Sequence, residues 1–296
     1  MKIEKVDAHH HLWLANSLHH PMLQAPDMER FFGNTAGLKQ DFHAAQFLPL
    51  AASQNVTRSV YVESHFQPAI EETASIEAFA AEYGFPHAIV GSADLAGSKL
   101  EEELDLHQRS PLFRGLRVLV NHDPDPKVRA TADPNVMSNP AWRNGFVELG
   151  RRGLSAEIML MPRQLQDLRD LASACSDTPL IVGHTGLPFR RSEAEQQDWE
   201  SGMEALAALP QVSVKISGLG MVDRNWTTDR IREIVTCVIE WFGPQRCMFA
   251  SNFPVDALHA SYAEIWDAFD AITAAYPAED RSALFRDTAM RIYGLT

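Results

Sequence analysis

The chain has few cysteines, little positive charge and no long hydrophobic run. Its three cysteines are odd in number, widely spaced and form no CxxC pair, which argues against a disulfide framework or a thiolate zinc site. We therefore expect a reducing, cytoplasmic location. No apolar run approaches the roughly 20 residues that span a bilayer, and no basic and apolar leader precedes the first candidate strand. These features predict a soluble protein that is not exported and has no membrane partner.

Positive charge is scarce relative to negative charge. The 26 lysines and arginines against 39 aspartates and glutamates give a formal net charge of −13, which disfavours nucleic acid as a partner. A small-molecule substrate is the partner we expect, and an anionic substrate would need arginines placed locally. The 296 residues, 45% of them hydrophobic, can bury a large core. Without repeats, low-complexity tracts or linkers, the sequence predicts a single domain over residues 1–296.

Short β-branched or apolar runs alternate with longer amphipathic runs, as in repeated βα units around a parallel sheet. Eight such alternations predict an α/β protein with a (β/α)8 TIM barrel. A doubly wound open sheet is the alternative, but it usually has fewer strands and a glycine-rich phosphate loop after the first strand, which this sequence lacks. Barrels of this kind often form dimers, so a homodimer is a possible oligomeric state. The candidate strands are 3–9, 58–64, 87–93, 116–121, 155–160, 180–184, 212–217 and 247–251. The candidate helices are 69–83, 99–108, 141–152, 163–175, 193–209, 228–242 and 262–275.

Three consecutive histidines, His9, His10 and His11, end the first candidate strand. Side chains alternate along a strand, so His9 and His11 should point one way and His10 the other. Two imidazoles on one face can hold a metal ion or a reacting carbonyl. A purification tag is the alternative interpretation, but a tag would not be embedded in a strand-forming run.

Polar residues recur at the carboxyl ends of the candidate strands, where the chemistry of such barrels is located. Each has a structural alternative when taken singly, such as a loop cap, an ion-pair partner or a backbone hydrogen bond. Their joint occurrence predicts an inward-facing polar ring. Its members are His9, His11, Glu63, His65, Asp94, Arg117, Asn121, Glu157, His184, Lys215, Ser217, Ser251 and Asn252.

Five motifs follow one another at these strand ends: Asp7-Ala8-His9-His10-His11-Leu12-Trp13, Arg114-Gly115-Leu116-Arg117, Gly183-His184-Thr185-Gly186-Leu187-Pro188, Lys215-Ile216-Ser217-Gly218-Leu219 and Ser251-Asn252-Phe253-Pro254. Together they resemble the amidohydrolase superfamily, and more narrowly its amidohydrolase-2 branch of sugar-lactone and 2-pyrone-4,6-dicarboxylate lactonases, with metal-dependent decarboxylases as relatives. The resemblance implies that His9, His11 and His184 hold a metal ion or the substrate carbonyl. One divalent ion, zinc or manganese, is the implied cofactor. Branch members that work without metal make metal-free catalysis the alternative.

The sequence departs from the family pattern at Asn252, where the family usually has an aspartate that ligates the metal and takes a proton from water. An amide has no basic lone pair at neutral pH, so Asn252 cannot be the general base, although its oxygen can ligate weakly and its amino group can donate. His184, Asp256 and Glu157 are the candidates to replace the missing carboxylate. A weak or absent metal and a loss of hydrolysis are the other possible consequences.

Arg117 is the candidate to bind a substrate carboxylate or hydroxyl through its planar fork, with a salt bridge inside the barrel as the alternative. Lys215 either acts as a second electrophile or pairs with Glu157. His65 and Trp13 are expected in the substrate pocket, although an aromatic residue near a barrel mouth is at least as often part of the packing. The long segments 14–42 and 122–140 are candidate substrate lids, and for the first an ordinary surface excursion is the alternative.

Residues and resemblance together predict a hydrolase of a small carboxylated or sugar-acid lactone. An activated water would open the ring ester while a cation or hydrogen-bond donors stabilise the oxyanion. A metal-dependent decarboxylase is the alternative, and Asn252 argues against it because such an enzyme needs a tightly held ion. A catalytically silent ligand-binding barrel is the third hypothesis.

Overall fold

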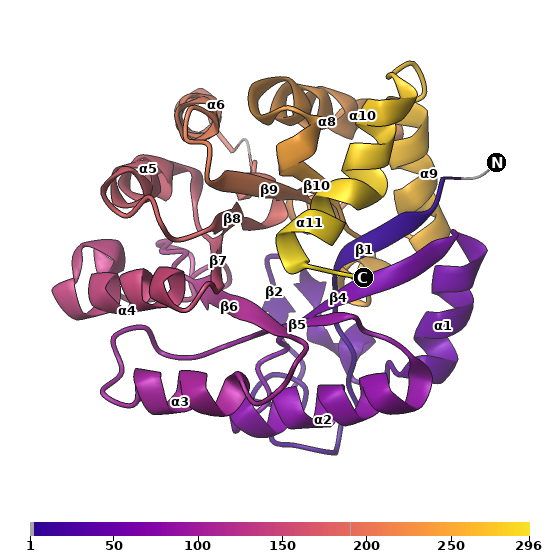
Figure 1. The fold of residues 1–296 in the computed structure, drawn as a ribbon. Helices are drawn as coiled ribbons and strands as arrows, with labels where there is room; N and C mark the ends of the chain where they lie inside the picture. The colour runs from indigo at the N-terminus through magenta and orange to yellow at the C-terminus, as the bar shows by residue number, and fades with distance from the viewer. Residues whose placement is uncertain (1–2, 190) are drawn as a thin grey trace.

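The computed structural model describes residues 3–189 and 191–296, and its eight main strands form a nearly closed parallel barrel (Figure 1). The strands neighbour one another in chain order, which confirms the predicted (β/α)8 barrel. All eight predicted strands are present, with ends shifted by a few residues. They are β1 (Lys5–His10), β4 (Val56–Val62), β5 (Ala88–Gly91), β6 (Phe113–Leu119), β7 (Ser155–Met159), β8 (Leu180–Val182), β9 (Val212–Ile216) and β10 (Cys247–Phe249).

The ring closes where β1 meets the segment that follows β10. The backbone N–H of Asn252 donates to the carbonyl of His9 at 2.8 Å, and that of His11 donates to the carbonyl of Phe253 at 2.7 Å. These bonds replace a full ladder between the first and last strands. They also place Asn252 directly beside the histidine motif.

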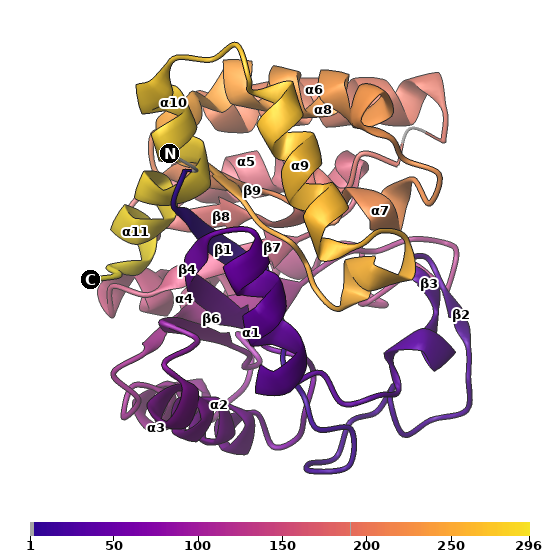
Figure 2. The same ribbon diagram turned by 90° about the vertical axis from the view of Figure 1, so that its right-hand side faces the viewer.

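The helices surround the strands (Figures 1 and 2). The seven predicted helices are all present, as α2 (Ala69–Tyr83), α3 (Leu100–His107), α4 (Pro140–Arg151), α5 (Leu165–Ala174), α6 (Glu193–Ala207), α8 (Thr228–Phe242) and α9 (Tyr262–Ile272). The sequence did not predict α1 (Ala44–Ser53), which contains Pro49, a residue that usually interrupts a helix. It also missed the short α7 (Leu219–Val222) and the C-terminal α10 (Ala278–Ser282) and α11 (Thr288–Tyr293).

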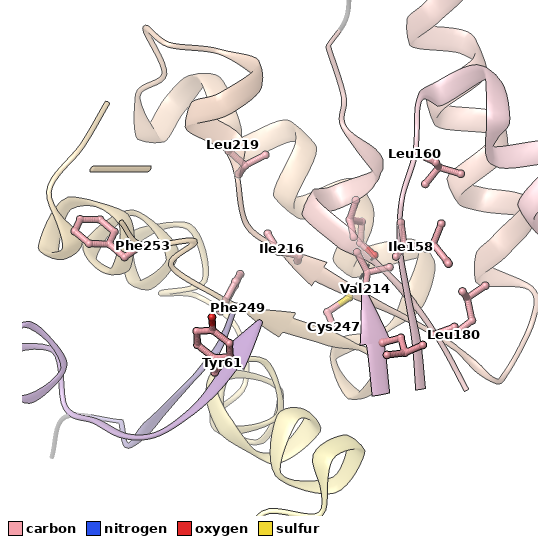
Figure 3. Packing of buried hydrophobic residues seen from close by; sticks show 14 of the residues in the cluster. Tyr61, Ile158, Leu160, Leu180, Val214, Ile216, Leu219, Cys247, Phe249 and Phe253 are labelled. Atoms are coloured by element: carbon pink, nitrogen blue, oxygen red, sulfur yellow. Dashed lines mark hydrogen bonds between the residues drawn. The ribbon is translucent and has the colours of Figure 1, made fainter. Parts of the chain in front are cut away.

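The barrel wall has an apolar outer surface that packs against the helices. Figure 3 shows part of this layer, including Ile158, Leu180, Val214 and Phe249, all of which are buried. The alternate residues of the strands face inward, as the period of two in a β-strand requires. On one side of the interior they are small and apolar, and they join α11 in a separate cluster that contains Val6, Ala8, Val60, Val62, Ala88, Val90, Ile181, Met248, Ala250, Ala289, Tyr293 and Leu295.

The two ends of the barrel differ. Both chain termini lie at one end, and the two-stranded hairpin of β2 (Glu29–Arg30) and β3 (Gly33–Asn34) lies at the other (Figure 2). Tyr293 of α11 reaches the barrel interior and fills the end near the termini. The opposite end, where the strands have their carboxyl termini, is therefore the one available to a substrate.

The structure also shows how buried the cysteines are and whether a helix could span a membrane. Cys175 and Cys237 are half-buried and Cys247 is buried, and none of the three forms a disulfide within residues 3–189 and 191–296. No helix within residues 3–189 and 191–296 combines the length and apolarity that crossing a bilayer requires.

Candidate active site

The two imidazoles of the first strand are brought together by an irregularity in β1. Val6 and Ala8 face the barrel interior, so strict alternation would also turn His10 inward. The register between β1 and β4 shifts between Asp7 and His10. His9 then follows Ala8 to the inside, while His10 points outward, stacks on Phe47 at 4.1 Å between ring centroids and bonds Ser59 at 2.8 Å. The predicted separation of His9 and His11 from His10 is confirmed.

His9 and His11 face each other with their Nε2 atoms 3.3 Å apart. The Nδ1–H of His11 donates to the carbonyl of Val62 at 2.9 Å, and since a carbonyl only accepts, Nε2 of His11 carries the lone pair. Burial lowers the pKa of both rings well below its usual value. Both imidazoles are therefore neutral at pH 7, and Nδ1 of His9 is buried without a hydrogen-bond partner in the described part of the chain.

His184 joins this pair from the opposite side of the barrel. Its ring centroid lies 4.6 Å from that of His9, and its Nδ1 lies 3.1 Å from the hydroxyl of Ser217. Gly218 allows this approach: it has a φ of +65°, and a Cβ there would lie 2.7 Å from Nδ1 of His184. Burial, reinforced by the charges of Arg117 and Lys215, lowers the pKa of His184 to about 3. The structure thus brings three neutral imidazoles together from two distant motifs.

Arg117 is held by a carboxylate at the end of the next-but-one strand. Its Nε and Nη2 both lie 2.6 Å from Oε1 of Glu63, and Nη2 also donates to the Glu63 carbonyl at 3.0 Å. The salt bridge that was the structural alternative is thus present. Nη1 of Arg117 has no partner in the described chain, so two N–H donors remain for a ligand. His65 lies 3.3 Å from Nη2 of Arg117, and its side chain is 46% exposed.

Asn252 and Asp256 form a buried amide–carboxyl pair beside the histidines. The amino group of Asn252 donates to Oδ1 of Asp256 at 3.2 Å, which turns the amide oxygen the other way. Burial raises the pKa of Asp256 to about 7. Asn252 lines the main cavity described below, whereas Asp256 lies behind it and does not. A catalytic role for Asp256 therefore stays a prediction. It would require another group to connect the Asp256 carboxyl with a substrate in the cavity.

Glu157 and Lys215 make a buried ion pair in the barrel interior. Nζ of Lys215 lies 2.6 Å from Oε2 of Glu157, and their side chains are 0% and 2% exposed. The second oxygen of Glu157 accepts a hydrogen bond from Tyr293. Of the two alternatives for Lys215, the pairing with Glu157 is the one observed. Neither residue lines the cavity, so their placement favours a structural role over contact with substrate.

A cavity of about 440 Å³ opens at the carboxyl ends of the strands. The predicted site residues on its wall are His11, Trp13, His65, Arg117, Asn121, His184 and Asn252. His9 lies between His11 and His184 just beneath. Trp13 is anchored by a 2.7 Å hydrogen bond from its indole to the carbonyl of Gln40. Both long segments, 14–42 and 122–140, contribute to the wall, the second through Val128 and Ala130.

Four further residues line the cavity: His20 and Arg30, which lie in the candidate lid 14–42 but were not predicted as site residues, and Ser64 and Gln67, which were not predicted either. Arg30 is part of the irregular segment after β1, where neither periodicity nor a motif marks a position. Ser64 lies 3.2 Å from Nδ1 of His11. The position of Ser64, a polar residue close to the end of a strand, was the one sequence feature that could have indicated its place in the site.

The imidazole nitrogens of the site can be compared with the ligands that a metal ion requires. Zinc–nitrogen bonds of about 2.0–2.1 Å in a tetrahedral site place two nitrogens roughly 3.3 Å apart, which matches the spacing of Nε2 in His9 and His11. Within residues 3–189 and 191–296, however, no three His, Cys, Asp or Glu side chains form a group that could hold a metal. Two protein ligands are fewer than the three of a catalytic zinc site. The residues present therefore do not fit a tightly held ion, and a set of three with His184 stays a prediction.

Comparisons with known proteins agree with this architecture. The amidohydrolase family model matches residues 6–295. The uncharacterized protein y4mH of Sinorhizobium fredii is 38% identical over 290 residues, 97% of either chain. An L-fucono-1,5-lactonase of Burkholderia multivorans is 28% identical over 303 residues, 98% of this chain and 96% of the other. A crystal structure of a Burkholderia multivorans amidohydrolase with bound zinc superimposes with a TM-score of 0.84 at 25% identity, covering 99% of this chain and 100% of that one.

Proposed function

Because this chain belongs to the amidohydrolase family, and is a hydrolase of that superfamily, we propose that it opens a small carboxylated or sugar-acid lactone. The L-fucono-1,5-lactonases that resemble it over most of their length support a ring ester as the substrate. The observation that carries the proposal is the convergence of neutral imidazoles and a partly free guanidinium on one cavity.

The reaction needs a base, an electrophile and a binding site. Water attacks the ring acyl carbon, the bond from that carbon to the ring oxygen breaks, and the ring oxygen takes up a proton. The product is an open-chain hydroxy acid, which releases a proton at neutral pH. His184 is the group we assign to accept the proton of the attacking water, because it is neutral, lines the cavity and is oriented by Ser217.

Arg117 supplies the electrophile in this scheme. A base with a pKa of about 3, as for His184, takes a proton from water only when the attacked carbonyl is strongly polarised. The free Nη1 of Arg117 can donate to the developing oxyanion, and Glu63 holds the guanidinium rigidly in place. Preorganised donors of this type lower a barrier by a few kcal/mol. In this scheme His11, on the cavity wall, is held by His9 just beneath it and orients the attacked group.

The test is a lactone panel followed with a pH indicator, using sugar lactones and 2-pyrone-4,6-dicarboxylate. We expect acid release with at least one of them, and a loss of at least about 100-fold in kcat/KM in His184→Asn. His10→Asn is the matched control, since His10 is a buried imidazole of the same motif that faces away from the cavity. It should retain turnover wherever it folds.

Two results would contradict the proposal. One is a flat response of the wild-type protein across the whole panel. The other is equal turnover in wild type and His184→Asn, which would remove the base. A decarboxylase would instead release carbon dioxide from an aromatic acid, and the lack of a three-residue metal-binding group within residues 3–189 and 191–296 argues against it.

A further inference from the structure

Arg30 is a cavity residue whose charge is not used by the protein itself. It is half-buried at the end of β2 and lines the cavity. Within the described chain its guanidinium makes no hydrogen bond, ion pair or ring contact. The other arginine of the cavity, Arg117, is neutralised by Glu63 at 2.6 Å. Leaving a half-buried cation without a partner costs free energy, so such a group at a binding site indicates an anionic ligand.

The cavity contains nothing that would neutralise Arg30. Among its described lining residues there is no aspartate or glutamate, although the whole chain carries 39 acidic residues. The protein as a whole has a net charge of −13. A cavity wall with an uncompensated arginine and no acidic residue is therefore positively charged within a negatively charged protein. It attracts an anion that the rest of the surface repels.

The backbone that carries Arg30 is fixed from a distant part of the chain. Arg224 forms an ion pair with Glu29 at 2.6 Å and donates to the carbonyls of Arg30 at 2.7 Å and Phe31 at 3.1 Å. His259 bonds the carbonyl of Phe32 at 2.7 Å. The β2 segment is thus anchored to the loops after β9 and β10, and the guanidinium is presented at a defined place over the site.

The wall around Arg30 is largely apolar. Beyond the imidazoles, the two arginines and four neutral polar side chains (Ser64, Gln67, Asn121 and Asn252), it consists of hydrocarbon, sulfur and aromatic groups, from Trp13, Pro21, Met22, Met28, Phe31, Phe32, Leu119, Val128, Ala130, Met159, Met221 and Val255. A polyhydroxylated ring would bury several hydroxyls against this wall, and each hydroxyl without a partner costs about 1–3 kcal/mol in proteins. An alkyl or aryl group placed there gains free energy instead.

We propose that Arg30 binds a carboxylate of the substrate and that the rest of the substrate is apolar, so that the preferred lactone is an alkyl- or aryl-substituted acid and not a sugar derivative. This inference narrows the proposed function. It rests on that function only in taking the substrate to be a lactone. The binding of an apolar carboxylate can be measured without any turnover.

Three six-carbon probes separate charge from polarity: hexanoate, its neutral amide hexanamide, and gluconate, an acid of equal charge with five hydroxyls. Isothermal titration calorimetry of the wild-type protein should rank hexanoate at least about tenfold tighter than either of the others. In Arg30→Gln we expect the affinity for hexanoate to fall about tenfold or more and that for hexanamide to stay within twofold. Arg30→Lys should recover part of the loss.

Arg129→Gln is the matched control, because Arg129 is an exposed arginine between two residues that line the cavity but is not itself on its wall. It removes the same charge and should leave all three affinities unchanged. A thermal melt of each variant checks folding. Arg30→Gln should melt like the wild type, since the Arg30 side chain has no partner to lose within residues 3–189 and 191–296.

Turnover then separates the two proposals. The same variants are compared on 5-oxotetrahydrofuran-2-carboxylate and its neutral carboxamide, and the preference for the acid should disappear in Arg30→Gln through a rise in KM. If no lactone is hydrolysed but hexanoate still binds through Arg30, the proposed function fails and this inference stands. If lactones are hydrolysed but Arg30→Gln binds hexanoate as the wild type does, or gluconate binds tighter than hexanoate, this inference is overturned.

Discussion

Replacing Lys215 by methionine should destabilise the protein strongly because it leaves the carboxylate of Glu157 buried without its cation. The Nζ–Oε2 distance is 2.6 Å and both side chains are almost fully inaccessible. Removing one partner of a buried pair costs about 3–5 kcal/mol. For a chain of this length the unfolding entropy near the melting temperature is about 0.6 kcal/mol/K. The melting temperature of Lys215→Met should therefore fall by roughly 5–8 °C.

A second substitution should return most of this loss. Glu157→Leu combined with Lys215→Met replaces both charges by apolar side chains of similar size, a change that is often neutral in other proteins. The hydroxyl of Tyr293 then loses its acceptor, which costs about 1–3 kcal/mol. Adding Tyr293→Phe should remove that remaining cost. Denaturant unfolding of the single, double and triple variants measures each step.

The same series decides whether the pair is structural or catalytic. If the pair only supports the barrel, the triple variant should keep kcat/KM within a few-fold of the wild type on whichever lactone is turned over. If Glu157 or Lys215 acts on the substrate, the triple variant should be stable and inactive. The structural reasoning is refuted by that outcome, and equally by a Lys215→Met protein whose free energy of unfolding stays within about 1 kcal/mol of the wild type.

Three further predictions concern the residues around the imidazoles. His11→Asn should abolish turnover while remaining folded, as circular dichroism would show, and a fully active variant would contradict its place in the site. Asn252→Asp should raise the zinc content towards one ion per chain in elemental analysis, because it adds a carboxylate beside two imidazoles; unchanged zinc would show that the position is not a ligand. Burial raises the pKa of Asp256 to about 7, so the folded state holds this proton more tightly than the unfolded state, and stability falls as pH rises from about 4 to 7. The free energy of unfolding, measured with urea, should fall between pH 5 and pH 8 by about 2–3 kcal/mol less in Asp256→Asn than in the wild type. An equal fall in both proteins would contradict the assignment.

Much of the architecture could be predicted because it is encoded locally. Each strand is a short apolar run and each long helix an amphipathic one, so periodicity alone located them. The carboxyl ends of parallel strands share one end of a barrel, so the clustering of His11, His184 and Asn252 followed from topology. The helix α1 was missed since its Pro49 is a local signal that the tertiary packing overrides.

Partner choice could not be predicted, because it depends on distances between residues far apart in the chain. Arg117 could have met a ligand or a carboxylate, and the fold places Glu63 against it. Lys215 had two alternatives, and its buried pairing with Glu157 is decided by strands β7 and β9, which flank β8 and both turn these side chains into the interior. Arg30 lies in the candidate lid 14–42, but nothing in the sequence distinguished it there, since its place on the cavity wall depends on where a long loop returns.

The amino-acid sequence by itself determined the barrel, the end of it that holds the chemistry and the residue types gathered there, since strand and helix periods are properties of short segments. The tertiary structure alone decided which charges are neutralised and which remain available. It turned His9 inward through a shift of register in β1, neutralised Arg117 with Glu63 and left Arg30 without a partner among the residues that the structure describes. The physical reason is that the free energy of a charge depends on its burial and its neighbours, and both are set only when distant segments meet.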